Sequence, residues 1–146
     1  MDDAKRQLVQ NWLVKALHDL ATARKAAAEP DPYFDTAVYH CQQAAEKAIK
    51  GYLVFRDQQF EKVHDVRLLV ASAAELESKF SVWLDVGERL TPYATAFRYP
   101  GEILEPDREE FSGALKDAEG IYDFVLSLLP ADVQPSHPAE KTDHPE

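Results

Sequence analysis

Residues 39–54, YHCQQAAEKAIKGYLV, decide the fold, because their apolar side chains recur at steps of three and four residues. This spacing places them on one face of an α-helix. The pattern predicts a helix over residues 33–56, with the apolar stripe Phe34, Ala37, Val38, Cys41, Ala44, Ala45, Ala48, Ile49, Tyr52 and Phe55. Its small central side chains let a neighbouring helix approach closely.

The same periodicity dominates the chain from its second residue to Leu129, with no sustained alternation of the strand kind. It predicts four further helices, over residues 3–28, 66–79, 82–98 and 106–129. Asp65 and Ser81 suit the caps of the third and fourth helices, and Pro106 suits the first position of the fifth. The first helix carries the stripe Leu8, Trp12, Leu13, Ala16, Leu20 and Ala23. Short connections predict an all-α fold, an antiparallel up-and-down bundle of four to five helices.

The length of 146 residues and the 45% of hydrophobic residues are typical of one globular domain. Residues 130–146, PADVQPSHPAEKTDHPE, contain four prolines and almost no large apolar side chains. Such a segment buries too little surface to offset the entropy of ordering it. We therefore expect a helical domain over residues 1–129 and a disordered tail over residues 130–146.

The net charge of −10 excludes a broad nucleic-acid surface, since recognition of many phosphates needs a basic footprint. A local basic pocket remains compatible with it. The first residues contain no apolar run of signal-peptide or membrane-span length, which predicts a cytoplasmic protein that does not enter the membrane. The single cysteine, Cys41, excludes an intramolecular disulfide.

Four polar residues recur at helical spacing on the second predicted helix: His40, Gln43, Lys47 and Lys50. Such a stripe on an otherwise apolar helix often faces a groove or a partner. Alternatively it is a solvated face with ion pairs, because Glu46 stands four residues before Lys50 in the favourable orientation. Both interpretations stay open on spacing alone.

Two further clusters are candidates for chemistry. Arg98 and Tyr99 follow Tyr93 and Phe97, and a guanidinium beside aromatic rings suits recognition of a phosphate. Arg98 alone would also stabilise the dipole of a helix that ends there. His64 before Asp65 could act as a general base with an orienting carboxylate, or Asp65 could cap a helix while His64 bonds to the backbone.

No metal site or cofactor is expected from these motifs. Glu61 and His64 have the Glu-x-x-His spacing of di-iron bundles, but those sites need two such motifs, and the chain has one. No Gly-rich phosphate loop or nucleophile elbow occurs in the sequence.

Residues 40–50, HCQQAAEKAIK, followed by His64-Asp65 and by Arg98-Tyr99-Pro100, resemble the bacterial and archaeal HEPN domains. The resemblance covers residues 3 to 129. It implies an antiparallel bundle that dimerises and is often encoded beside a small nucleotidyltransferase, with which it forms a toxin–antitoxin-like complex.

Many members of this family are metal-independent RNases that carry an arginine followed four to six residues later by a histidine. In this chain Arg98 is followed by YPGEILEPD, which lacks that histidine. The resemblance therefore favours an interaction module over an enzyme: a homodimer that pairs with a minimal nucleotidyltransferase and binds a nucleotide or RNA end. The residues expected to bind this ligand are Arg98, Tyr99, Lys47, His40 and Asp65. The alternative is an RNase that uses Arg98 with His64.

Overall fold

The computed structural model describes residues 1–97, 99–100 and 105–135. Three long helices dominate it, α1 (Asp3–Ala26), α2 (Phe34–Phe55) and α5 (Arg108–Ser127). The shorter elements are α3 (Val66–Leu76), α4 (Leu84–Leu90) and three 3₁₀ segments, η1 (Ser78–Trp83), η2 (Thr91–Ala94) and η3 (Ala131–Val133). These described ranges contain no strand, and the all-α bundle is confirmed.

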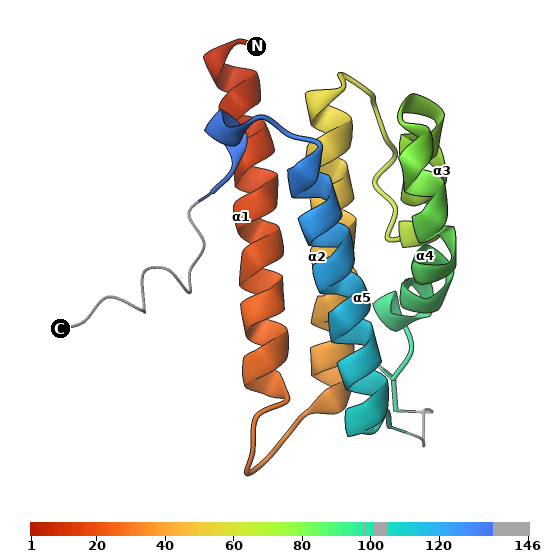
Figure 1. The fold of residues 1–146 in the computed structure, drawn as a ribbon. Coiled ribbons are helices and arrows are strands. Elements are labelled where there is room, and N and C mark those ends of the chain that lie inside the picture. Colours follow the sequence, from red (N-terminus) through yellow and green to blue (C-terminus); the bar gives the residue numbers. More distant parts are fainter. Residues whose placement is uncertain (98, 101–104, 136–146) are drawn as a thin grey trace, which may run out of the picture.

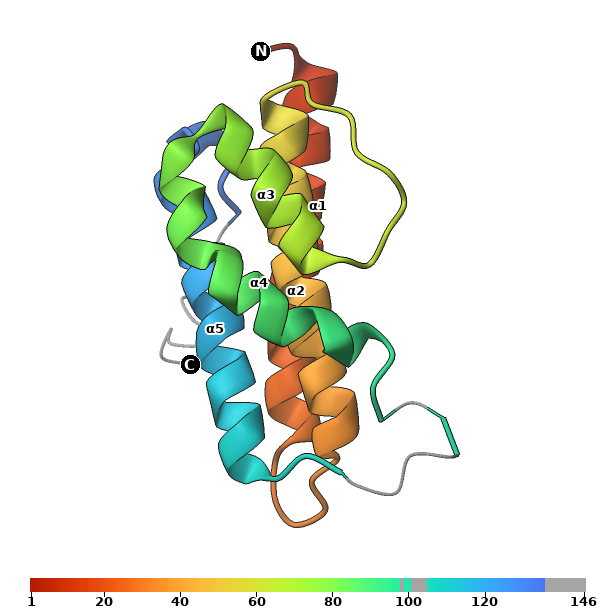
Figure 2. The ribbon, with the colours of Figure 1, turned by 90° about the vertical axis from the view of Figure 1, so that its right-hand side faces the viewer.

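The chain direction alternates along the bundle with one exception. In Figure 1, α1 runs down and α2 returns beside it. The connection over residues 56–65 then descends along α3, so that α3 runs in the same direction as α2 (Figure 2). η1 and α4 lead the chain back down. α5 then rises in the same direction as α2 and packs on it.

α2 is the central helix, because it contacts α1, α3, η2 and α5. Its alanines 37, 44, 45 and 48 are completely buried, as the small side chains of its sequence predicted. Gly51 shows how close the approach is, since a Cβ added there would lie 3.2 Å from the Cβ of Trp12. Bulkier residues in this stripe would push α1 away from α2.

The helix starts follow the expected capping chemistry at some positions only. Asp65 caps α3, and its carboxylate accepts a hydrogen bond from the Leu68 amide at 2.9 Å, as predicted. α5 begins later than predicted, because Asp107 is its N-cap and Pro106 precedes the cap. Ser81 lies inside η1 instead of capping a helix, and Glu77 caps that segment.

The prediction of one continuous fourth helix over residues 82–98 is wrong. Regular α-helix covers only Leu84–Leu90, and η1 and η2 flank it. Pro92 explains the early end, because it cannot donate the next hydrogen bond of the α-helical ladder. The α-helix tightens at this point into η2. Arg98, at the end of the predicted helix, lies outside the described residues.

The buried stripe of α1 differs by one position from the prediction at its start. Val9 is completely buried, whereas Leu8 is 48% exposed and Trp12 is half-buried. Leu13, Ala16, Leu20 and Ala23 lie in the core as expected. The sequence offered two adjacent apolar residues at positions 8 and 9, and only the packing on α2 selects between them.

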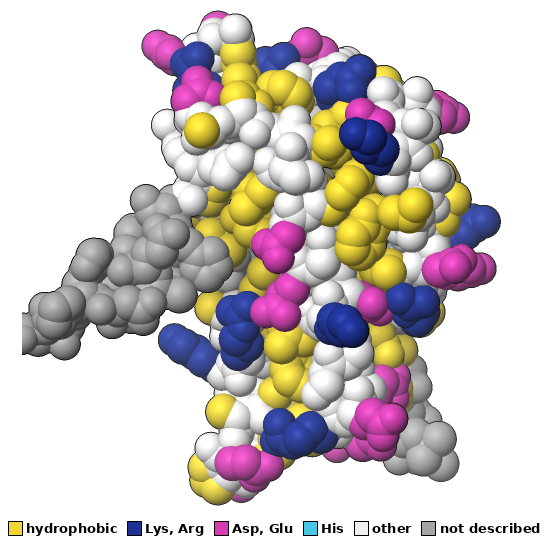
Figure 3. Space-filling model, viewed as in Figure 1, with side chains coloured by type: hydrophobic (Ala, Val, Ile, Leu, Met, Phe, Trp, Pro, Cys, Tyr) yellow, Lys and Arg dark blue, Asp and Glu magenta, His cyan; other side chains and the backbone are white. Residues whose placement is uncertain are grey.

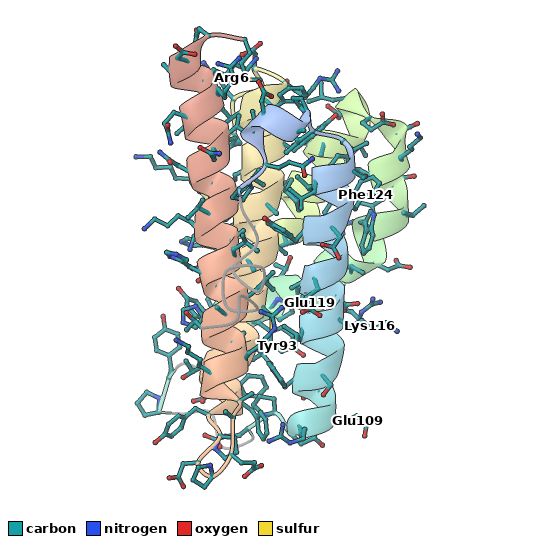
Figure 4. The ribbon with its side chains drawn as sticks, turned by 60° about the vertical axis from the view of Figure 1, so that its left-hand side comes forward. Arg6, Tyr93, Glu109, Lys116, Glu119 and Phe124 are labelled. Atoms are coloured by element: carbon teal, nitrogen blue, oxygen red, sulfur yellow. The ribbon has the colours of Figure 1, made fainter. Side chains whose placement is uncertain are left out.

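The packed part of the chain continues beyond the predicted boundary at residue 129. Val133 is completely buried, and the side-chain amide of Gln134 donates to the carbonyls of Leu126 and Leu129 at the end of α5. Arg6 bonds to Asp132 at 2.8 Å, which ties η3 to the start of α1 (Figure 4). The tail prediction therefore fails for residues 130–135, and residues 136–146 lie outside the described residues.

Candidate functional site

A buried carboxylate on α1 holds two cationic or titratable side chains of α2. Asp19 Oδ1 lies 2.8 Å from His40 Nδ1, and Asp19 Oδ2 lies 2.6 Å from Lys47 Nζ. Asp19 is 7% exposed, while the side chains of His40 and Lys47 are 25% and 26% exposed. We call these three residues the Asp19 cluster.

In the Asp19 cluster, the Asp19 carboxylate orients the imidazole of His40. A carboxylate at Nδ1 fixes the tautomer and the direction of the imidazole, which leaves Nε2 for a ligand. Gln43 lies on the same stripe, and its amide nitrogen donates to the Tyr39 hydroxyl at 2.7 Å. Its Oε1 is buried and has no hydrogen-bond partner among the described residues.

A second carboxylate, Glu46, forms a similar cluster further along α2. Lys50 donates to Glu46 at 2.8 Å, and His64 Nδ1 lies 3.0 Å from the same carboxylate. Gln42 also donates to Glu46, at 3.0 Å. Lys50 lies over the rings of Trp12 and Phe60, which face each other edge-on. We call Gln42, Glu46, Lys50 and His64 the Glu46 cluster.

The predicted polar stripe of α2 is therefore divided between two clusters and is largely enclosed. The predicted Glu46–Lys50 ion pair forms, but both side chains are buried. The interpretation of this part of the stripe as a solvated face is therefore wrong. The His64 ring bonds to the Glu46 carboxylate, whereas one of the two interpretations of the sequence had it bond to the backbone. Asp65 caps α3 and lies within 3.4 Å of the Thr91 hydroxyl, so it faces η2.

The aromatic cluster before Pro100 is partly described. The Tyr93 hydroxyl donates to Glu110, and burial together with this carboxylate raises the pKa of Tyr93 above its ordinary value of 10.0. Phe97 stacks on Tyr93 and adopts a positive φ of 65°. Tyr99 is 64% exposed, which suits a stacking surface, while Arg98 lies outside the described residues. Figure 4 shows Tyr93 beside α5, on which Glu119 and Lys116 lie.

Asp19 is the residue that sequence reasoning missed. It stands on the predicted apolar side of α1, among residues that pack on α2, and an acid there indicates a buried partner.

Among the residues that the structure describes, no three His, Cys, Asp or Glu side chains gather as they would around a metal ion. None of the described helices has the length and apolar character needed to cross a lipid bilayer.

A comparison with family models matches residues 9–128 to the HEPN domain. The chain belongs to the HEPN family. This HEPN chain is similar to TT1696 from Thermus thermophilus, with a TM-score of 0.70 and 29% identity over 83% of this chain and 98% of that one. It is also similar to ST0689, an archaeal HEPN homologue, with a TM-score of 0.63 and 25% identity over 82% of this chain and 96% of that one. No protein of curated function matches it.

Proposed function

We propose that this HEPN chain is an interaction module. It forms a homodimer, pairs with a minimal nucleotidyltransferase in a toxin–antitoxin-like system, and holds a nucleotide or an RNA end. Membership of the HEPN family supports the interaction module. The Asp19 cluster is the single observation that supports the proposed ligand site.

The Asp19 cluster suits a phosphorylated ligand for a physical reason. An ammonium group has three donors, and Lys47 uses one of them on Asp19, so a phosphate oxygen can accept from the others. Both Lys47 and His40 are partly desolvated, which strengthens a charge-assisted hydrogen bond over its value on an open surface. A chain of net charge −10 attracts phosphate only where such donors converge.

Titration of the protein with ATP and with a short oligoribonucleotide tests this ligand site. Lys47→Met and His40→Ala should each weaken binding at least about tenfold, since a hydrogen bond to a charged group contributes roughly 1.5–3 kcal/mol. The matched control is Lys15→Met, because Lys15 is an exposed lysine of α1 outside both clusters. Circular dichroism checks the fold of each variant. If the wild type binds neither ligand, the ligand part of the proposal is wrong.

Arg98 and Tyr99 complete the proposed ligand site on the strength of the sequence. Arg98→Ala should weaken binding about tenfold or more, and Arg98→Lys should not restore it fully, because an ammonium lacks the planar fork of the guanidinium. Equal binding by Arg98→Ala would limit the site to the Asp19 cluster.

The nucleotidyltransferase partner is tested through the neighbouring gene. A tagged HEPN chain should copurify with a nucleotidyltransferase that is encoded beside it and produced in the same cells. A neighbouring gene of another class, or a nucleotidyltransferase that does not copurify, would contradict the proposed partner. It would not affect the proposed ligand site.

A metal-independent RNase is the second candidate, and the Glu46 cluster favours it. The His64 side chain is 67% exposed and its Nδ1 faces a buried carboxylate, which is the arrangement of an oriented general base. RNA cleavage in EDTA that is lost in both His64→Ala and Arg98→Ala would support this function. His18→Ala is the control, because His18 is an exposed histidine of α1 outside both clusters. An inactive wild type excludes this candidate.

A further inference from the structure

We propose that the outer face of α3 is the surface through which two copies of this chain pair, with the two α3 helices antiparallel about a twofold axis at Ala71. This inference rests on the homodimer of the proposed function and names its interface.

The exposed side of α3 is one continuous stripe. Arg67, Ala71 and Glu75 are exposed and follow one another at four-residue steps, so they lie in a row about 12 Å long. The opposite side of the helix faces the core through Val66, Leu69, Val70 and Ala73. Figure 2 shows α3 on the outside of the bundle, beside the connection over residues 56–65.

The charges of this stripe are self-complementary. A twofold contact pairs residue i with residue j and residue j with residue i, so a patch must complement itself. With the axis at Ala71, Arg67 lies opposite the partner's Glu75, and Glu75 lies opposite the partner's Arg67. Neither side chain has an ion-pair partner among the described residues of one protomer. The small side chain of Ala71 allows the two helices to approach closely at the crossing.

A groove with both apolar and polar lining flanks the stripe, and its apolar part adds surface that a partner can cover. Leu68 is 49% exposed and borders this groove of about 400 Å³, which is also lined by Phe60, Val63, Ser72, Gln59 and Glu61. Burial of such a surface is what drives association, while the paired charges select the orientation.

The charge of the whole molecule favours this face over the exposed apolar surface of α1. Two chains of net charge −10 repel each other, and the repulsion is least where the contact is locally neutral, as it is between Arg67 and Glu75. The surface of α1 at Leu8 and Trp12 borders Lys15 and has no acidic side chain in its lining. A twofold contact centred on it would place Lys15 opposite the partner's Leu8, so it offers no charge pair that could fix the orientation. Figure 3 shows the side of α1 and α5, on which acidic and basic side chains are mixed with hydrophobic ones.

Charge exchange tests the interface. The dissociation constant of the full-length dimer is measured by sedimentation equilibrium at low salt for the wild type, Arg67→Glu, Glu75→Arg and the double variant. Each single exchange should raise the dissociation constant at least about tenfold, because it places like charges opposite each other twice. The double exchange should return it to within about threefold of the wild type, because both pairs form again with reversed sign.

Controls separate the interface from the homodimer itself. Lys15→Glu and Asp123→Arg change exposed charges of α1 and α5 by the same amounts and should leave the dissociation constant unchanged. Circular dichroism confirms that each variant folds. A monomeric wild type overturns the homodimer and this interface together. A dimer that persists in both single exchanges, or that the double exchange does not restore, overturns the α3 interface and leaves the homodimer in place.

Discussion

Glu46 is buried and accepts hydrogen bonds from Lys50 and Gln42, with His64 at its outer side. Loss of one partner of a buried ion pair leaves a charge without compensation, which costs about 3–5 kcal/mol. We expect Lys50→Ala to lower the free energy of unfolding by about 3 kcal/mol, measured by urea denaturation. Lys62→Ala changes an exposed lysine and should alter it by less than about 0.5 kcal/mol. Similar values for both variants would mean that the buried pair is not stabilising.

Cys41 is completely enclosed between the helices. Burial, helped by the charge of Glu119, raises the pKa of its thiol from 9.0 to about 12. Because the thiolate is the reactive form, we expect no reaction of the folded protein with Ellman's reagent near about pH 8, and full reaction in urea. Prompt labelling of the folded protein would show that this part of the bundle opens.

The same pKa shift of Cys41 also sets a direction for stability against pH. The folded-state pKa is raised, so the contribution of the thiol to stability is fully present below pH 9.0 and is lost as the pH rises toward about 12. Burial raises the pKa of Tyr122 in the same direction from its ordinary value of 10.0. The free energy of unfolding should therefore fall as the pH rises above about 9. A value that stays level to pH 11 would contradict this account.

At the scale of elements, two glycines of α5 offer a matched pair of substitutions. A Cβ at Gly120 would lie 2.8 Å from the Trp83 ring, whereas a Cβ at Gly113 would meet nothing within 4 Å. Gly120→Ala should destabilise the protein by about 1–3 kcal/mol through overpacking. Gly113→Ala should stabilise it by about 0.5–1 kcal/mol, because alanine favours a helix over glycine. Thermal denaturation of both variants is the measurement. A stabilising effect of Gly120→Ala would show that Trp83, in η1, moves freely away from the added methyl group.

The existence and the order of the helices could be predicted from the sequence, and their ends only in part. Periodicity places α1, α2 and α5 well, since each has a long apolar stripe. It fails at the fourth helix, where the apolar spacing continues through Pro92 but the hydrogen-bond ladder cannot.

The candidate site could be predicted as a set of residues on α2, but not as two separate clusters. His40 and Lys47 meet only through Asp19, and Lys50 and His64 meet only through Glu46. Such contacts depend on which helices lie side by side, and spacing within one helix does not contain that information.

At the scale of the whole molecule, the end of the described chain contributes to stability. Val133 is buried, and Asp132 pairs with Arg6. A chain that ends after residue 129 should lose these contacts, and its thermal midpoint should fall by more than about 4 °C. A chain that ends after residue 135 should keep them and melt within about 2 °C of the full chain, because residues 136–146 offer few large apolar side chains. Equal midpoints for the two truncations would contradict the role of η3.

The contact between η3 and the first turn of α1 also bears on synthesis. Arg6 and its partner Asp132 are more than a hundred residues apart, so Arg6 is made long before the residue that it pairs with. At about 5–20 residues per second, the start of α1 waits several seconds or longer for this contact. The first turn of α1 is therefore open to chaperones and proteases until η3 has been made and has left the ribosome, whereas α1 and α2 can already pair with each other.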